Sequence, residues 1–339
     1  MSTTTRAFAA FNPREPLKDH EMDLGPLRDG QVEIEVESWG VCHSDLSMLD
    51  NEWGFSAYPL VAGHEIVGTV TAAGPDVKRV SVGDRVGLGW FSESCMACPD
   101  CLSGDHNLCA TSEQTIVGRS GGFAERVRCH WTWATPLPPA LDVAKAGPLF
   151  CGGITVFSPF LDFGVRPTDR VGIVGVGGLG HLAVQFADKW GCEVFAFSSD
   201  ESKHDELRRL GADHVVNSRD PASWKGLARS LDLLLVTVNV SLDWPALIET
   251  LRPDGRLHFV GAVLEPVSVS AFSLITTRRS VSGSPLGSPH ATALMLEFCA
   301  RHGITPVTEH FPMSHVNDAL EHLRAGKARY RIVLDADWE

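Results

Sequence analysis

Four cysteines lie close together in the first third of the chain. Cys95, Cys98, Cys101 and Cys109 follow the spacing C-x2-C-x2-C-x7-C. Four thiolates at this spacing can converge tetrahedrally on Zn²⁺ at ~2.3 Å. Because sulfur then fills every coordination position, the pattern predicts a structural zinc that fixes a loop poor in apolar residues. An iron–sulfur cluster and four free or disulfide-bonded cysteines are the alternatives.

A glycine-rich turn forms the second motif. The segment 175–180 has the sequence GVGGLG, with Gly175, Gly177 and Gly180 at the G-x-G-x-x-G positions, after an apolar run and before a helical pattern. Such a turn lets a pyrophosphate approach backbone N–H groups at the positive end of a helix. We expect a dinucleotide site here that includes Gly178 and Leu179. A purely structural turn is the alternative.

Three further metal-binding residue types are scattered along the chain. Cys42 lies in GVCHSD, His64 and Glu65 lie in GHEIVG, and Cys151 lies in LFCGGIT. A lone cysteine is most often a small buried hydrophobic residue, and a lone histidine more often belongs to the core. Spacing alone therefore does not establish a shared site for these residues.

The composition is that of an ordinary globular protein. The chain has 339 residues, 44% apolar and 21% charged, and at roughly 100–200 residues per domain it suggests two domains. Its 29 Lys and Arg against 42 Asp and Glu give a formal charge of −13, which disfavours nucleic acid and anionic membranes as partners. We see no apolar segment long enough to span a bilayer and no signal-peptide pattern. A cytoplasmic location is therefore expected. Because that compartment is reducing, the nine cysteines favour metal binding over disulfides.

The elements that must position these residues change character along the chain. Before the Pro-rich segment 135–139, short strand-like runs such as 31–38 and 63–70 are broken by Gly and Pro, which indicates a mainly-β module. Later, strands alternate with helices, as in parallel βαβ units. Strands are expected at 170–175, 193–198, 231–238 and 256–261, with helices at 179–190 and up to Gly211. The predicted fold class is α/β with a doubly wound parallel sheet.

The end of the chain departs from this alternation. A helical segment at 291–301 is followed by a last helix at 314–325 and a strand at 330–335. We expect these last elements to return to the first module.

The segments GVCHSD, GHEIVG, the four-cysteine segment, LFCGGIT and the glycine turn together resemble the zinc-dependent medium-chain alcohol dehydrogenases. More closely, the chain is similar to the cinnamyl alcohol dehydrogenase branch and its bacterial aldehyde reductase relatives, because the signatures follow that branch's order from Gly40 to Gly287. The resemblance implies a GroES-like catalytic domain over residues 1–147 with a structural zinc lobe at 90–110. It also implies a Rossmann cofactor-binding domain over 148–295 and a return segment of the catalytic domain over 296–339.

The resemblance implies a catalytic Zn²⁺ held by Cys42, His64 and Cys151, with water or substrate oxygen in the fourth position. Glu65 matches a residue near the metal that binds it transiently. Asp45 matches the carboxylate that orients the zinc-bound histidine.

A proton relay is also implied by the resemblance. Ser44 matches the hydroxyl that passes a proton to or from the zinc-bound oxygen, with a helix N-cap or turn serine as the alternative. The family often has a histidine where this chain has Ser47. Water or another group such as His43 would have to take its place.

The end of the second strand of the Rossmann domain governs the choice of cofactor. A carboxylate there would bind the ribose 2′-hydroxyl of NAD, but this chain has Ser198. Ser199 and Lys203 follow, as in NADP-using members of the branch, where hydroxyls and an ammonium hold the 2′-phosphate. NADP(H) is therefore expected, while Asp200 keeps NAD as the alternative.

Further contacts follow from the resemblance. Thr155 matches a residue beside the nicotinamide, and backbone groups near Val238, Val260 and Ser284 match those that meet its carboxamide. Trp53, Trp90 and Phe91 match positions that line the substrate channel, and ordinary core packing is the alternative for each. Cys129, Cys192 and Cys299 are expected to be buried apolar thiols.

The function implied is interconversion of primary alcohols and aldehydes, aromatic or apolar ones, by hydride transfer to or from NADP(H). The segment 279–288 resembles the edge strand through which family members form homodimers, with a tetramer as the alternative. A C=N reductase on the same scaffold and a non-catalytic NADPH-binding protein are the rival functions. A metal-free quinone reductase is disfavoured, because it would need neither the Cys42, His64 and Cys151 set nor the four lobe cysteines.

Overall fold

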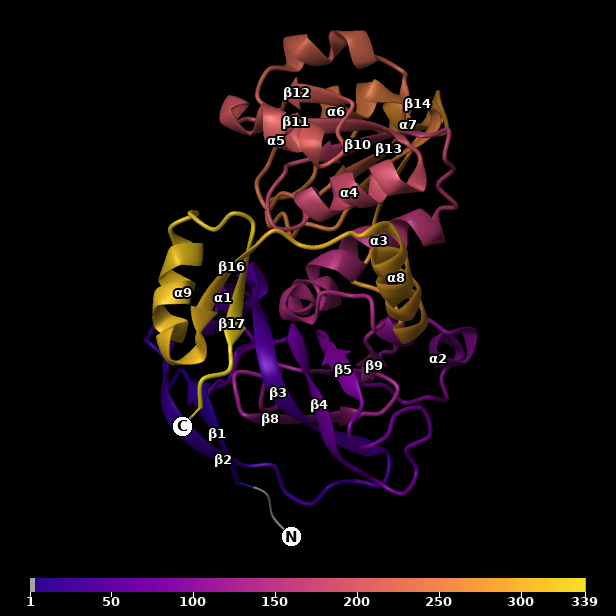
Figure 1. The fold of residues 1–339 in the computed structure, drawn as a ribbon. Coiled ribbons are helices and arrows are strands. Elements are labelled where there is room, and N and C mark those ends of the chain that lie inside the picture. Colours follow the sequence, from indigo (N-terminus) through magenta and orange to yellow (C-terminus); the bar gives the residue numbers. More distant parts are fainter. Residues whose placement is uncertain (1–3, 339) are drawn as a thin grey trace. The chain divides into compact units, whose positions relative to one another are not determined.

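The computed structural model describes residues 4–338 and divides the chain into two compact units (Figure 1). Unit 1 comprises Met1–Ile154 and Gly287–Glu339, and unit 2 comprises Thr155–Leu286. The sequence-based boundaries at 147/148 and 295/296 differ from these by seven and nine residues. The helix α8 (Pro289–His302) lies in unit 1, where Met295 packs against Gly153 at the start of α3 (Gly152–Asp162).

Unit 1 is built on a seven-stranded sheet with the order β16-β17-β3-β4-β5-β9, in which β8 also pairs with β3. The strands are β3 (Gln31–Val41), β4 (Ile66–Ala73), β5 (Arg85–Leu88), β8 (Arg126–His130), β9 (Thr135–Pro136), β16 (Thr308–Pro312) and β17 (Arg331–Asp335). The pairing of β17 with β3, antiparallel with Ile332 opposite Val41, confirms that the end of the chain returns to the first module. In Figure 1 the helix α9 (Val316–Arg324) lies against β16 and β17.

Smaller elements complete unit 1. They are the hairpin of β1 (Thr4–Ala9) and β2 (Lys18–Asp23), the two-stranded sheet of β6 (Phe91–Glu93) and β7 (Glu113–Gln114), and the helices α1 (His43–Leu49) and α2 (Pro99–Ser103). The predicted mainly-β module is confirmed.

Unit 2 is a six-stranded parallel sheet with the order β12-β11-β10-β13-β14-β15. Its strands are β10 (Arg170–Val174), β11 (Glu193–Ser198), β12 (His214–Asn217), β13 (Leu231–Val236), β14 (Leu251–Phe259) and β15 (Ser280–Gly283). Numbered from β10, this is the doubly wound order 3-2-1-4-5-6, whose direction reverses between β10 and β13. Ligands bind such sheets at the carboxyl ends of the strands beside that point.

The helices of unit 2 are α4 (Gly180–Trp190), α5 (His204–Arg209), α6 (Trp244–Thr250) and α7 (Ala271–Ile275). α4 buries Leu182, Ala183 and Phe186 at helical spacing and ends at Gly191, whose φ of 101° suits glycine. The core between the sheet and α6 includes Phe197, Leu234, Trp244 and Leu257. β14 begins earlier than predicted, because Leu251 already pairs with Leu231 before a register shift. Within residues 4–338, none of the helices has the length and apolar character needed to cross a membrane.

Candidate active site

Three separate segments of unit 1 bring together the scattered residues Cys42, His64, Glu65 and Cys151. Cys42 follows β3, His64 and Glu65 precede β4, and Cys151 precedes α3. All four are buried, and one ligand atom from each lies within 4.8 Å of the others. The two sulfur atoms are 3.9 Å apart. The structure therefore brings these donors together as the resemblance predicts.

Asp45 orients the histidine of this cluster. Its Oδ1 accepts hydrogen bonds from His64 Nδ1 at 2.8 Å and from the backbone N–H of Gly63 at 2.9 Å, and its Oδ2 accepts from the N–H of Cys42 at 2.9 Å. Because Nδ1 is engaged, Nε2 is the free end of the ring, and this buried atom has no partner among the described residues. An orphaned nitrogen beside two thiols is the arrangement expected of a metal ligand.

The electrostatics of the cluster favour a cation beside the sulfur atoms. The hydrogen bond from Cys151 holds the pKa of Cys42 well below its ordinary value, against the effect of burial. Burial opposes a charge on His64, but Asp45 and Cys42 outweigh it and raise the pKa of the imidazole well above its usual range. A thiolate and an imidazolium are thus favoured together. Zn²⁺ in place of that ring proton would put a larger positive charge at the same position, beside the sulfur atoms, so the donor set fits this metal.

Arg331 on β17 is a residue of this site that the sequence analysis missed. Its Nη2 donates to Glu65 Oε1, and both side chains are buried. Gly40 makes room for the carboxylate, because a Cβ there would lie 2.0 Å from Glu65 Oε2. Burial raises the pKa of Glu65 to about 7 even though Arg331 opposes the shift. The second oxygen, Oε2, has no partner among the described residues, which suits a carboxylate that approaches a metal.

The relay residues lie on or beside α1. Ser44 is the second residue of this helix and Cys42 occupies the N-cap, so the alternative of an N-cap serine is wrong. The hydroxyl of Ser47, which stands where the family often has a histidine, donates to Glu52 Oε2 at 2.7 Å. His43 is exposed and Ser44 is half-buried.

Aromatic rings lead away from His64. The ring of Trp90 meets His64 edge-on at 5.0 Å, Trp53 meets Trp90 at 6.0 Å, and Phe55 stacks on Trp53 at 5.8 Å. Phe55, which the sequence analysis missed, is 53% exposed. Phe91 instead is buried and packs on Trp133 at 5.3 Å. Trp53 and Trp90 therefore belong to one aromatic row that runs from the buried histidine to the surface.

The four lobe cysteines form the second metal-type cluster in the described part of the chain. Their four sulfur atoms, from Cys95, Cys98, Cys101 and Cys109, all lie within 4.8 Å of one another. Backbone N–H groups point at these sulfurs, and the N–H of Cys95 is the main cause that lowers the pKa of Cys109 to about 6. No disulfide forms among the nine cysteines. The pKa of Cys95 is lowered as well, whereas burial raises that of Cys101 to about 12. Four converging sulfur atoms fit a structural zinc.

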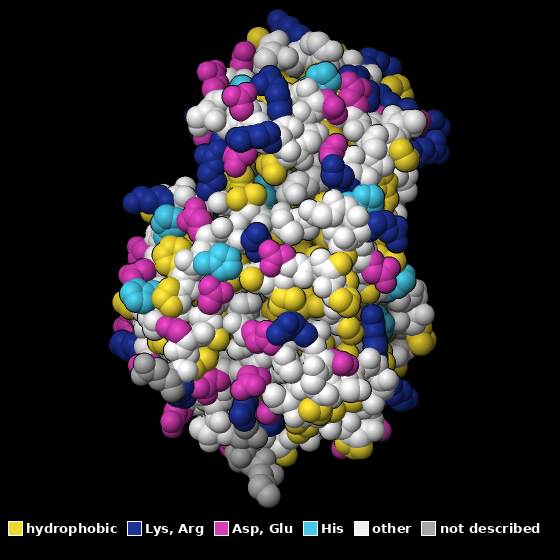
Figure 2. Space-filling view, in the orientation of Figure 1, with side chains coloured by type: hydrophobic (Ala, Val, Ile, Leu, Met, Phe, Trp, Pro, Cys, Tyr) yellow, Lys and Arg dark blue, Asp and Glu magenta, His cyan; other side chains and the backbone are white. Residues whose placement is uncertain are grey.

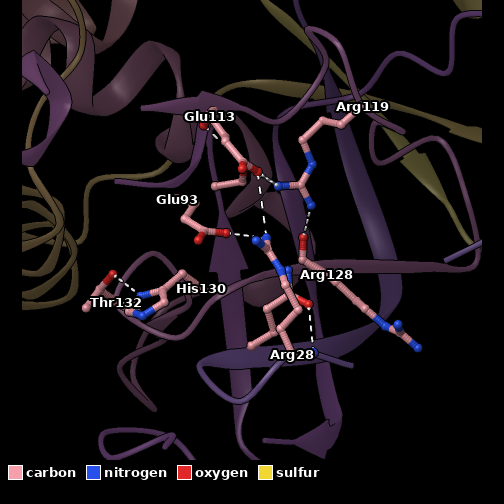
Figure 3. Close-up of polar contacts among 9 residues, drawn as sticks. Arg28, Glu93, Glu113, Arg119, Arg128, His130 and Thr132 are labelled. Carbon is pink, nitrogen blue, oxygen red and sulfur yellow. Dashed lines mark hydrogen bonds and ion pairs between the residues drawn. The ribbon is translucent and has the colours of Figure 1, made fainter. Parts of the chain in front are cut away.

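A network of ion pairs lies at the two strands that flank this lobe, β6 and β7. No sequence motif predicted it. Figure 3 shows Arg28 against Glu93 of β6, and Arg119 against both Glu113 of β7 and the carbonyl of Arg128. β6 and β7 flank the lobe on either side. Arg119 therefore links one end of the lobe to β8, and Arg28 links the other end to the segment before β3. Figure 3 also shows His130 hydrogen-bonded to Thr132 at 2.8 Å.

The glycine turn of unit 2 lies between β10 and α4, as predicted. Gly175 has a φ of 91°, and a Cβ at Gly180 would lie 2.0 Å from the carbonyl oxygen of Gly175. At Gly177 a Cβ would meet nothing within 4 Å. The turn is thus tight at Gly175 and Gly180 and open at Gly177, where a phosphate would approach. Gly178 and Leu179 lead into the helix. These residues fit a dinucleotide.

The side chains at the end of β11 bear on the choice of dinucleotide. Ser198 ends the strand, and Asp200 caps the following turn by accepting from Ser202 N at 3.0 Å and Ser202 Oγ at 2.6 Å. Lys203 Nζ lies 4.0 Å from Asp200 Oδ2, and Ser199 is exposed. The carboxylate of Asp200 is thus engaged locally, and the hydroxyls of Ser198 and Ser199 and the ammonium of Lys203 lie at or just after the strand end.

The remaining candidate cofactor residues also lie at strand or helix ends. Val238 follows β13, Val260 directly follows β14 and Ser284 directly follows β15, so all three share the carboxyl edge with the glycine turn. Thr155 is a buried residue of α3. Cys129, Cys192 and Cys299 are buried, and burial raises the pKa of each thiol to about 12, as expected for apolar thiols.

Comparison with known proteins agrees with this geometry. The alcohol dehydrogenase GroES-like domain matches residues 28–139, and the zinc-binding dehydrogenase family matches residues 178–301. The aldehyde reductase AdhA of Synechocystis is 54% identical over 97% of this chain and 98% of its own. The solved structures of a cinnamyl alcohol dehydrogenase from Sorghum bicolor (36% identical, TM-score 0.94) and of CAD from Helicobacter pylori complexed with NADP(H) (30% identical, TM-score 0.91) each match over 99% of both chains. The chain therefore belongs to the zinc-binding alcohol dehydrogenases of the medium-chain dehydrogenase family.

Proposed function

We propose that this protein is an NADP(H)-dependent zinc oxidoreductase that interconverts primary alcohols and aldehydes. The observation that carries the proposal is the buried cluster of Cys42, Cys151 and an orphaned His64 Nε2 oriented by Asp45. The matching relatives, which include an aldehyde reductase and cinnamyl alcohol dehydrogenases, support the same reaction.

The residues of the site divide the work. Bound zinc supplies a Lewis acid for the carbonyl oxygen and NADPH supplies the hydride. Cys42, His64 and Cys151 hold the metal, and Asp45 keeps the imidazole in the binding orientation. Arg331 balances the charge of buried Glu65. Ser44 passes a proton to the oxygen on reduction and takes it back on oxidation.

The proposed cofactor is NADP(H) because of the side chains that follow β11. Ser198 and Ser199 offer hydroxyls and Lys203 an ammonium, groups that hold a phosphate. Asp200 is engaged as the cap of the following turn. One relative's structure was solved with NADP(H).

The aromatic row favours planar or apolar aldehydes. Trp90, Trp53 and Phe55 continue outward from His64 in ring contacts of 5.0–6.0 Å, and such walls bury rings and conjugated chains. On the face that Figure 2 shows, acidic and basic side chains are interspersed. This pattern favours a small-molecule substrate over a nucleic acid.

We also propose a cytoplasmic homodimer. β15 is an edge strand of its sheet, and unit 2 exposes Leu264, Phe272 and Ile275 by 71%, 74% and 73%. Pairing of two β15 edges would hide the strand and bury part of this apolar surface. Nine unpaired thiols suit a reducing compartment.

The test is the initial rate of nicotinamide oxidation by zinc-loaded protein with cinnamaldehyde, using NADPH and NADH in parallel. The proposal predicts turnover with NADPH and much slower turnover with NADH. A panel of aromatic and aliphatic aldehydes that gives no turnover with either cofactor would overturn it.

A further inference from the structure

A buried histidine of unit 2 bridges two serines at the carboxyl edge of the sheet. His258 lies on β14 and is 0% exposed. Its Nδ1 lies 2.9 Å from Ser282 Oγ and its Nε2 lies 2.9 Å from Ser284 Oγ. Side chains alternate along a strand, and His258 pairs with Ser282 in the β14–β15 register. The three side chains therefore form one chain of hydrogen bonds along the same face.

Arg256 gives this chain a direction. Its Nη1 donates to Ser282 Oγ at 3.1 Å, while its guanidinium lies over the ring of Phe163 at 4.1 Å. A guanidinium cannot accept a hydrogen bond. Ser282 therefore accepts from Arg256, and its own proton is directed to the acceptor beside it, His258 Nδ1.

The donor-to-acceptor direction continues through His258 to Ser284. Burial, with a smaller contribution from Arg256, lowers the pKa of His258 to about 4, so the ring is neutral in the physiological range. A neutral imidazole has one donor and one acceptor nitrogen. With Nδ1 accepting from Ser282, the proton is on Nε2, which donates to Ser284 Oγ. The hydroxyl proton of Ser284 is then left to point away from His258.

The position of Ser284 identifies the acceptor for that proton. A dinucleotide with its adenine ribose near Ser198 of β11 and its pyrophosphate at the turn after β10 continues across the switch point. Its nicotinamide half then lies at the carboxyl ends of β13, β14 and β15. Ser284 directly follows β15 and is half-buried. The acceptor that the nicotinamide half offers there is the oxygen of its carboxamide.

We propose that His258 is a positioning residue that, through the chain Arg256–Ser282–His258–Ser284, presents the Ser284 hydroxyl as a donor to the nicotinamide carboxamide. This rests on the proposed NADP(H) function and adds to it a specific recognition of the reactive ring. It differs from the backbone contacts that the family resemblance implies near Ser284.

The test compares two ligands bound to the zinc-loaded protein without substrate. One is NADPH, and the other is 2′-phospho-ADP-ribose, which keeps the phosphates and adenosine but lacks the nicotinamide. His258→Leu and Ser284→Ala are expected to weaken NADPH binding about three- to tenfold, the value of one hydrogen bond, and to leave the Kd of 2′-phospho-ADP-ribose unchanged. His258→Gln, which keeps a donor and an acceptor, should recover part of the loss. Ser280→Ala on the same strand is the control.

Equal weakening of both ligands in His258→Leu would show that the histidine only supports the fold, and unchanged NADPH binding would show that it does not act on the cofactor. Either result overturns the proposal. Failure of the unmodified protein to bind NADPH at all would instead refute the proposed cofactor. A second readout is the ¹⁵N spectrum of the His258 ring, which should show the Nε2–H tautomer at neutral pH, and an Nδ1–H tautomer would contradict the direction of the chain.

Discussion

The Oδ1 atom of Asp45 lies 2.8 Å from Nδ1 of His64, and the Nε2 atom of that ring has no partner among the described residues. The same carboxylate accepts the N–H groups of Gly63 and Cys42. One side chain thus holds the ring of His64, the backbone of the residue before it and the backbone of Cys42.

Asp45→Asn should therefore weaken zinc at the Cys42–His64–Cys151 site by about 10–100-fold, as is typical when the partner of a ligating histidine is removed. The amide cannot accept from all three N–H groups as a carboxylate does. Zinc release to a chelator, followed over time, checks this. The lobe zinc serves as the internal control, and equal retention of both ions in the variant would contradict the role given to Asp45.

Cofactor choice should respond to the end of β11. Ser198→Asp places a carboxylate where a 2′-phosphate would lie, so the kcat/KM ratio of NADPH to NADH should fall by at least about tenfold, since each ~1.4 kcal/mol is tenfold. Asp200→Ala is the matched comparison. Because Asp200 caps the turn locally, its loss should leave NADPH as the preferred cofactor. If instead the unmodified protein uses both cofactors and Asp200→Ala loses only its activity with NADH, Asp200 binds the ribose of NAD.

The aromatic row should discriminate among substrates. Phe55→Ala removes a stacked ring 5.8 Å from Trp53, and an aromatic contact is worth about 0.5–1.5 kcal/mol. We expect kcat/KM for cinnamaldehyde to fall about three- to tenfold while that for acetaldehyde, which is too short to reach the ring, stays within about twofold. Equal losses for both aldehydes would point to a structural role.

A buried ion pair under the lobe should matter for stability. Arg128 donates to Glu33 Oε2 through Nε at 2.8 Å and Nη2 at 2.6 Å, and the two side chains are 6% and 8% exposed. Arg128→Met leaves the buried carboxylate with only the longer contact to Arg126, and removing one partner of a buried ion pair costs about 3–5 kcal/mol of unfolding free energy. Arg126, 40% exposed and 3.8 Å from Glu33 Oε1, is the control, and its Met variant should lose less than about 1 kcal/mol. Denaturant unfolding compares the two, and similar losses would refute the assignment.

Local sequence was sufficient for the parts of the site that lie in short motifs. The spacings of Cys95 to Cys109 and of the glycine turn predicted a metal cluster and a dinucleotide turn, with alternatives left open, and the resemblance linked Cys42, His64 and Cys151. Alternation of strands and helices predicted the parallel sheet, since those elements are contiguous in the chain. The sequence predicted that the end of the chain returns to the first module, but not that β17 pairs with β3.

Contacts made by packing could not be foreseen. Arg331 contacts Glu65, which is 266 residues away in the chain, and an arginine at the first position of a buried strand carries no local signal of its partner. The same holds for Arg119 at the lobe base and for His258, whose role depends on the register that sets β14 beside β15. Phe55 was missed because its ring contact with Trp53 depends on how the loop between them turns.

Zinc content and aldehyde turnover, measured together in the unmodified protein, Cys151→Ala and Cys98→Ala, test whether the buried cluster holds the catalytic metal. The unmodified protein should bind two zinc ions per chain. Cys151→Ala should keep the lobe zinc and lose turnover, because the other ligands cannot hold the metal for chemistry without it. Cys98→Ala should lose the lobe zinc and stability. Full turnover in Cys151→Ala would contradict the central claim that the buried Cys42–His64–Cys151 cluster holds the catalytic metal.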